Sequence, residues 1–121
     1  MTSSVMVMPP LTDPVILAQF QKVLAEWNYT GYITAKDVAR LWIADNLPGM
    51  SLKAIAKAML EYVASGGVID QVQETRLEWN MWPFHYDFRL VLGGKNVYVE
   101  TVLKDDDPND PTLEIVSIHN V

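Results

Sequence analysis

Side chains that could carry acid–base chemistry gather in two neighbouring segments, 85–92 and 95–103, which are joined by Gly93-Gly94. Apolar and polar residues alternate in both segments, and this alternation predicts two antiparallel strands. A two-residue glycine loop suits a type I′ turn, because both of its central residues need a positive φ. If Leu92 pairs with Lys95, one side of this hairpin is apolar. The other side then carries His85, Asp87, Arg89, Tyr98 and Glu100.

The predicted register places Arg89 opposite Tyr98 and Asp87 opposite Glu100. It is well specified, because a slip by one residue would turn the apolar side chains to the solvent. An imidazole, a guanidinium, a phenol and two carboxylates are the groups of general acid–base catalysis and of charge stabilisation in phosphoryl or acyl transfer. A polar solvent face with cross-strand ion pairs is also typical of an ordinary antiparallel sheet, so both interpretations stay open.

The chain has two histidines and no cysteine. His119 ends the last predicted strand, and its adjacency to His85 would create a site with two imidazoles. A metal site would need both imidazoles together with carboxylates such as Asp87 or Glu100. No HExxH-type spacing, phosphate loop or nucleophile motif is present, so we expect no metal and no cofactor. The candidate catalytic residues are His85, Arg89, Tyr98, Glu100 and His119.

The most unusual stretch of the chain is the apolar segment 77–84. Tryptophan and methionine are favoured in protein interfaces, and this favours a surface for a protein partner or a second copy of the chain. The alternative is a loop that folds over the sheet and buries its own aromatic side chains. The candidate partner-binding residues are Trp79, Met81, Trp82 and Phe84.

Three helices are predicted in the first half of the chain from apolar residues at helical spacing. The first covers residues 14–27 with Asp13 as its N-cap. The second begins at Thr34, with Asp37 as the other half of a capping box, and the apolar residues Val38, Leu41 and Trp42 line one of its faces. The third begins at Ser51, buries the stripe of Leu52, Ile55, Met59 and Val63, and ends at Gly66-Gly67.

Four strands are predicted after the helices, over residues 68–75, 85–92, 95–103 and 112–119. The fold class is therefore α+β: three N-terminal helices packed on an antiparallel sheet of about four strands with a Gly-Gly hairpin. Residues 1–11 have no period and contain Pro9-Pro10, and we expect them to form a flexible lead-in. Residues 12–121 are expected to form a single domain, since this length suits one hydrophobic core.

The net charge of −6 belongs to the second half of the chain. Residues 1–66 carry five basic and five acidic side chains, whereas residues 67–121 carry four basic and ten acidic ones. The first residues lack the pattern of a secretory signal, and no apolar stretch is long enough to span a membrane. For a chain without cysteine, the reducing cytoplasm is the simplest expected location.

Residues 33–75 resemble a winged-helix unit in their order of two helices and a following strand. Two basic pairs at helical spacing would supply phosphate contacts there. The second of these helices lacks the Arg, Asn and Gln side chains that read base edges, so we expect nucleic acid to bind weakly or not at all. The candidate nucleic-acid-binding residues are Lys36, Arg40, Lys53 and Lys57.

Residues 60–119 resemble small toxin-like families related to RelE and ParE. The resemblance rests on a helix that ends in Gly66-Gly67 and on the strand segments Val68–Asp70, Phe88–Leu90, Val97–Glu100 and Ile115–His119. It implies helices on one side of an antiparallel sheet and, in active members, an RNA-cleaving site on the other side. The residues that match the catalytic types of such enzymes are His85, Arg89, Tyr98, Glu100 and His119. Active members tend to be basic, and the acidic sheet half departs from this pattern.

Because no catalytic sequence motif is present, the first functional hypothesis is a small non-enzymatic binding or interaction protein that associates with a partner or with itself. The second hypothesis is a RelE-like ribonuclease, or an inactive relative, with His85 or Glu100 in proton transfer and Arg89 as the group that stabilises phosphate charge. The third hypothesis is a weak nucleic-acid binder of the winged-helix type.

Overall fold

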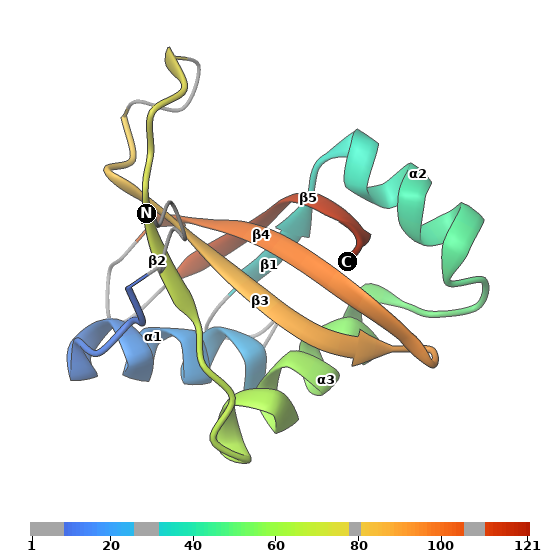
Figure 1. The fold of residues 1–121 in the computed structure, drawn as a ribbon, viewed down its shortest axis with the longest axis horizontal. Coiled ribbons are helices and arrows are strands. Elements are labelled where there is room, and N and C mark those ends of the chain that lie inside the picture. The colour runs from blue at the N-terminus through green and yellow to red at the C-terminus, as the bar shows by residue number, and fades with distance from the viewer. Residues whose placement is uncertain (1–8, 26–31, 78–80, 106–110) are drawn as a thin grey trace, which may run out of the picture.

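The protein is an α+β domain in which a five-stranded mixed sheet packs against helices (Figure 1). The computed structural model describes residues 9–25, 32–77, 81–105 and 111–121. Within them, the elements in chain order are α1 (Pro14–Ala25), β1 (Tyr32–Ala35), α2 (Asp37–Asn46), α3 (Leu52–Ala64), β2 (Asp70–Gln73), β3 (Phe84–Leu92), β4 (Lys95–Asp105) and β5 (Thr112–Asn120). The strand order across the sheet is β1-β5-β4-β3-β2.

The first and third helices begin as the sequence predicts. A carboxylate oxygen of Asp13 accepts a hydrogen bond from the backbone N–H of Val15 at 2.9 Å. The hydroxyl oxygen of Ser51 accepts one from the N–H of Ala54 at 3.1 Å. These side chains partner amide groups that the first turn of a helix leaves without intrahelical acceptors. Local sequence therefore sets where α1 and α3 begin.

The predicted start of the second helix is wrong. Thr34 lies in β1, which runs parallel to β5 and pairs its Ala35 with Ile115. α2 begins only at Asp37, and Lys36 at the N-cap provides no side-chain hydrogen bond. A strand of four residues is too short to show a period of its own, and its partner strand lies about eighty residues away in the chain. The sheet is consequently mixed, with five strands in place of about four antiparallel ones.

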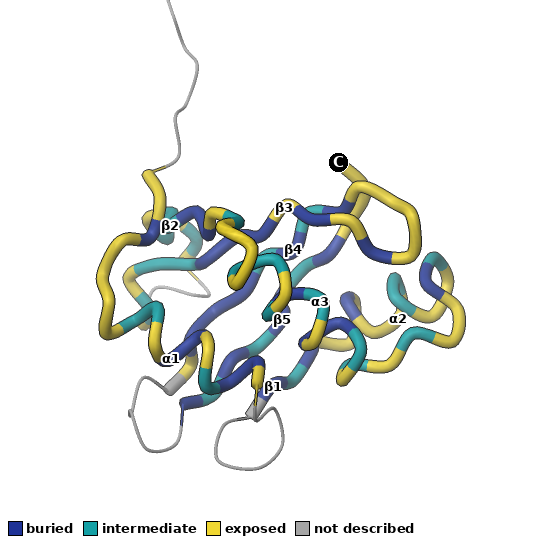
Figure 2. Tube along the Cα trace, turned by 90° about the horizontal axis from the view of Figure 1, so that it is seen from below, coloured by how far each residue is buried: buried dark blue, intermediate teal, exposed yellow. Residues whose placement is uncertain are grey.

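The hydrophobic core lies between the sheet and the two helices α1 and α3, which occupy the same side of the sheet in Figure 1 and lie in front of it in Figure 2. Phe20 of α1 and Phe88 of β3 are fully buried, with ring centroids 5.8 Å apart. Ile55 and Met59 of α3 are also fully buried, in agreement with the predicted stripe. We call the opposite side of the sheet the open face.

The apolar face that the sequence indicates for the second helix is only partly buried. Val38 and Leu41 are each 65% exposed, whereas Ala39 is fully buried. Trp42 and Ile43 are half-buried and pack against the core. Helical spacing alone is compatible with a stripe on either side of Trp42, and the contact of α2 with β5 selects the side that contains Ala39. Two large apolar side chains are left at the surface.

Residues 9–11, which the sequence assigns to the flexible lead-in, run beside β2. The N–H of Leu11 donates to the carbonyl of Ile69 at 2.7 Å, and the N–H of Gln71 donates to the carbonyl of Pro9 at 2.8 Å. The side chain of Leu11 is buried in the core. Residues 1–8 lie outside the described part of the chain. None of the described helices has the length and apolar composition needed to cross a lipid bilayer.

Candidate functional site on the open face

The hairpin of β3 and β4 adopts the register that the alternation of its residues predicts. Arg89 lies opposite Tyr98, and Asp87 lies opposite Glu100. Both glycines of the turn have positive φ, 56° and 78°. The alternate residues of these strands enter the core with α1 and α3, so the polar side chains are turned toward the open face.

Asp87 is at the centre of a hydrogen-bonded group on the open face. One of its carboxylate oxygens lies 2.8 Å from Nδ1 of His85, and the other accepts a hydrogen bond from the hydroxyl of Tyr98. The Asp87 side chain is only 1% exposed, and this burial raises its pKa above the ordinary value. Burial and the bond to Asp87 likewise raise the pKa of Tyr98. The carboxylate therefore holds His85 and Tyr98 in fixed positions.

Arg76 joins two further carboxylates beside His85. Its guanidinium donates to Glu74 at 2.9 Å and also to Glu100. The hydrogen bond from Arg76 lowers the pKa of Glu74 to about 2, and the same contact raises the pKa of Arg76. We call these four residues, Glu74, Arg76, His85 and Glu100, the Arg76 cluster.

Glu74 and Arg76 were missed by the sequence analysis. They follow β2, whose Val72 pairs with His85 across the sheet. Alternation along β2 places Glu74 on the same side of the sheet as Val72, and this alternation can be read from the sequence. The pairing of β2 with β3, which brings that side next to His85, is a tertiary contact and has no local signature.

The remaining candidate catalytic residues, Arg89 and His119, also lie on the open face. Arg89 is 53% exposed and forms an ion pair with Asp70 of β2. His119 of β5 is exposed and lies opposite Tyr98, with the two rings stacked at a centroid distance of 5.1 Å. His119 therefore contacts Tyr98, while His85 contacts Asp87. The structure places all five candidate catalytic residues on one face, and it links the two histidines through Tyr98 and Asp87.

Glu74, His85 and Glu100 offer ligand atoms that lie within 4.8 Å of one another. Such a spacing would suit a divalent cation. The guanidinium of Arg76 contacts both carboxylates, however, and already neutralises part of their charge. A metal ion would have to displace it. The arrangement as it stands combines an imidazole, a carboxylate and a guanidinium, which are the groups of proton transfer and of anion stabilisation.

The candidate partner-binding segment borders a groove at the end of the open face. Trp82 is half-buried, its indole N–H donates to the carbonyl of Lys104 at 3.2 Å, and the ammonium of Lys104 lies 5.9 Å from its ring centroid. Met81 is 72% exposed, whereas Phe84 is half-buried against the core. Trp79 lies outside the described residues. The groove has a volume of about 560 Å³ and is lined by Lys36, Val38, Met81, Trp82, Lys104, Glu114 and Val116; we call it the Trp82 groove.

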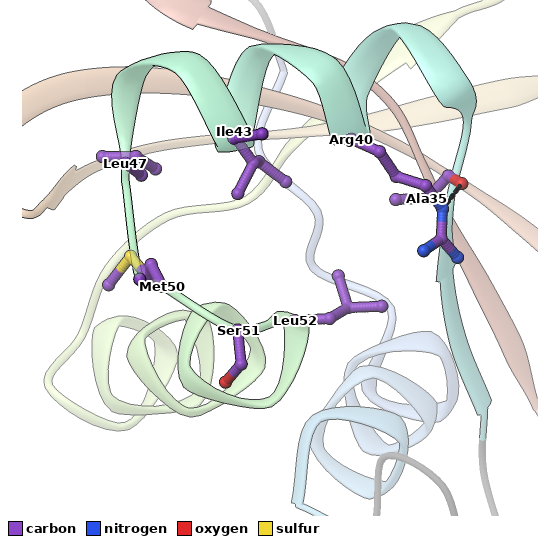
Figure 3. A pocket seen from close by; sticks show the side chains of 9 residues that line it. Ala35, Arg40, Ile43, Leu47, Met50, Ser51 and Leu52 are labelled. Carbon is purple, nitrogen blue, oxygen red and sulfur yellow. Dashed lines mark hydrogen bonds between the residues drawn. The ribbon is translucent and has the colours of Figure 1, made fainter.

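The candidate nucleic-acid-binding residues do not form one patch. Lys53 and Lys57 are exposed on α3, on the helical side of the domain. Arg40 lines a separate pocket of about 320 Å³ between α2 and the start of α3 (Figure 3), where its Nε donates to the carbonyl of Ala35 at 2.9 Å. Lys36 belongs to the Trp82 groove. Of the four, Lys36 is therefore the one that borders the open face.

The acidic charge of the open face is compensated in part by cations. Asp70 pairs with Arg89, Glu74 and Glu100 pair with Arg76, and Lys104 lies 3.7 Å from Glu114. Four further acidic residues of the sheet half belong to the segment 105–110, which connects β4 with β5.

Comparison with protein-family models, with curated proteins and with solved structures finds no match to this chain.

Proposed function

We propose that the protein cleaves RNA by metal-independent acid–base chemistry at the Arg76 cluster. The observation that carries this proposal is the approach of His85 and Glu100, whose nitrogen and oxygen atoms lie within 4.8 Å of each other beside a guanidinium. A carboxylate and an imidazole supply a base and an acid at the same pH, because carboxylates ionise at much lower pH than imidazolium groups do. A guanidinium matches the geometry of phosphate oxygens.

The reaction that these groups suit is attack of a ribose 2′-hydroxyl on the adjacent phosphate. The carboxylate of Glu100 takes the proton of the 2′-hydroxyl, and the 2′-oxygen forms a bond to phosphorus. The bond from phosphorus to the 5′-oxygen breaks, and the imidazolium of His85 gives its proton to that leaving oxygen. The products are a 2′,3′-cyclic phosphate and a free 5′-hydroxyl. Each proton transfer of this kind typically contributes about 10²- to 10⁴-fold to the rate.

Two neighbouring groups have supporting roles in this proposal. Asp87 bonds Nδ1 of His85 and leaves Nε2 as the nitrogen that meets the leaving oxygen, in the way that a carboxylate orients a catalytic imidazole in other enzymes. Arg76 shifts from Glu100 to the phosphate and stabilises the charge that develops on its oxygens. Arg89, whose side chain is 53% exposed, is a second guanidinium on this face and would exchange its ion pair with Asp70 for a contact with the RNA backbone.

The resemblance of residues 60–119 to RelE- and ParE-related families supports the same function. The acidity of the sheet half opposes the binding of a polyanion. Local pairing of carboxylates with Arg76, Arg89 and Lys104 reduces that repulsion on the open face.

The test is cleavage of a short single-stranded RNA in the presence of EDTA. We expect cleavage by the wild-type protein, a loss of about 100-fold or more in Glu100→Gln and His85→Ala, and no loss in the exposed control Lys57→Ala. A substrate with a 2′-deoxyribose at the cleaved position should be inert. Absence of RNA cleavage, or equal cleavage of the deoxy substrate, would contradict the proposal.

A second candidate function is self-association through the outer side of α2. It is favoured by one observation, the exposure of Val38 and Leu41 on neighbouring turns of that helix. Burial of both side chains against a second copy would stabilise a dimer by the hydrophobic effect. Light scattering tests it: a dimer that Leu41→Asp converts to a monomer supports the idea, and a wild-type monomer at all concentrations contradicts it.

A further inference from the structure

The Trp82 groove continues the open face next to the Arg76 cluster. On β4, the residue beside His85 is Val102, because Tyr86 pairs with Thr101. Val102 in turn pairs with Glu114 of β5, which lines the groove. Neighbouring strands lie about 4.8 Å apart, so the edge of the groove lies about 10 Å from His85. A ligand held at His85 that is longer than a single phosphate group would extend into it.

The walls of the groove suit a flat apolar ring. Its apolar lining comes from Trp82 and Met81 and from Val38 of α2. Val116 belongs to the lining although it is almost fully buried, so that part of the groove is closed by an aliphatic side chain. The volume of about 560 Å³ lies within the range of sites that hold small organic groups. A nucleobase is a flat ring, and any of the bases can stack on a tryptophan side chain.

The charges of the groove favour a polyanion over other occupants. Among the residues that the structure describes, Lys36 and Lys104 line it together with the carboxylate of Glu114. Lys104 lies within 3.7 Å of that carboxylate and within 5.9 Å of the Trp82 ring centroid. A stacking tryptophan with cationic neighbours is the combination by which single-stranded nucleic acids are bound. The groove therefore differs in charge from the Arg76 cluster, where carboxylates predominate.

We propose that the Trp82 groove binds a nucleobase of single-stranded RNA whose neighbouring phosphate lies at the Arg76 cluster. This inference rests on the proposed function, of which it names the substrate: an unpaired RNA strand that is bound through stacking, not a duplex. It assigns a role to the aromatic segment that the cleavage chemistry leaves unused. It also explains why cations line this end of an otherwise acidic sheet half.

The experiment measures binding of a short fluorescent single-stranded 2′-deoxyoligonucleotide to the full chain by anisotropy. This probe lacks the 2′-hydroxyl and cannot be cleaved by the proposed reaction. We expect Trp82→Ala to weaken binding about ten-fold and Trp82→Phe to restore most of it. Lys104→Gln should lower the slope of log affinity against log salt by about one. Lys57→Gln, a matched change on exposed α3, should leave both quantities unchanged.

A third variant keeps the test valid if Trp82→Ala fails to fold. Met81 is 72% exposed, so Met81→Glu places a negative charge in the groove without disturbing the core, and it should weaken binding. Equal affinities of the wild type, Met81→Glu and Lys104→Gln would overturn the inference. So would a duplex probe that binds as well as the single strand, or a self-associated wild type in which the groove is covered and the probe is excluded.

RNA cleavage distinguishes this inference from the proposed function. If both hold, Trp82→Ala raises the KM for RNA and leaves kcat nearly unchanged, whereas His85→Ala lowers kcat. If the wild type binds the probe through Trp82 but cleaves no RNA, the groove is supported and the cleavage proposal fails. If RNA is cleaved with the same KM by wild type and by Met81→Glu, the groove fails and the cleavage proposal stands.

Discussion

Replacing the buried carboxylate of Asp87 tests whether it is the group that organises the open face. Asp87 is 1% exposed and holds both His85 and Tyr98. Asp87→Ala leaves those two polar groups without their partner, and a buried polar group left unpaired costs about 1–3 kcal/mol. Because His85 and Tyr98 are only partly buried, water can replace some of what is lost. We therefore expect a total loss of about 2–4 kcal/mol.

Asp87→Asn should behave differently, because the amide has nearly the same shape and can still bond one or both neighbours. It removes a charge whose burial is unfavourable, and this gain offsets the weaker hydrogen bonds. We expect a change of about 1 kcal/mol or less at pH 7. Urea unfolding followed by tryptophan fluorescence measures both variants. With a slope of about 2 kcal/mol per molar, in the middle of the usual range for urea, the alanine variant should unfold at a midpoint lower by about 1–2 M.

The pH dependence of this difference gives a second measurement. Burial raises the pKa of Asp87 above its ordinary value of 3.8, so the folded protein binds this proton more tightly than the unfolded chain does. Stability from this group is therefore full below pH 3.8 and is lost as the pH rises through the raised pKa. Asp87→Asn lacks that loss, so its stability relative to wild type should improve between pH 4 and pH 7.

Two results would refute the reasoning about Asp87. Equal destabilisation by Asp87→Asn and Asp87→Ala would show that the hydrogen bonds to His85 and Tyr98 are not what the carboxylate contributes. A stability of Asp87→Asn that falls relative to wild type as the pH rises would show that the charged form is favoured by the fold, contrary to the effect of burial.

Three further perturbations have expected outcomes. Arg76 holds the pKa of Glu74 near 2, so the stability from this pair is full above pH 4.5 and is lost as the pH falls through about 2. Arg76→Gln should cost about 1 kcal/mol at pH 7, because the guanidinium is partly exposed. In a plot of the urea midpoint against pH, this variant should show a smaller decrease at acid pH than the wild type. Gly67→Ala would place a Cβ 2.5 Å from the carbonyl oxygen of Tyr62, and we expect a loss of about 1–3 kcal/mol in thermal unfolding, so an unchanged Tm would contradict the close approach. Ser51→Ala should cost about 1 kcal/mol through the loss of its cap bond, whereas Ser51→Asp should retain most of the stability.

The hairpin of β3 and β4 could be predicted from the sequence in full register. Its alternation is local, and a shift by one residue would bury Asp87 and Glu100 in the core while exposing Phe88. That single constraint placed His85, Asp87, Arg89, Tyr98 and Glu100 on one face. The starts of α1 and α3 were equally local, since Asp13 and Ser51 bond amides within the next three residues.

Tertiary structure decided which side chains meet on that face. Arg76 reaches Glu100 only because β2 pairs with β3, and His119 stacks on Tyr98 only because β5 lies beside β4. The first of these contacts joins residues 24 positions apart and the second joins residues 21 positions apart, so no periodicity within one segment indicates them. The hydrogen bond between Tyr98 and Asp87 has the same origin, since it joins β4 to β3.

Tertiary contacts also overruled two local patterns in the first half of the chain. Thr34 satisfies the capping-box pattern, yet residues 32–35 form a strand because β5 offers its backbone groups as partners. The apolar positions Val38 and Leu41 are compatible with a buried stripe, yet the contact with β5 buries Ala39. Sequence by itself therefore determined the periodic elements and their polar face, because alternation and capping act over a few residues. Strand partners, the exposed side of α2 and the ion pairs of the open face depend on distant segments, and only the folded chain brings these together.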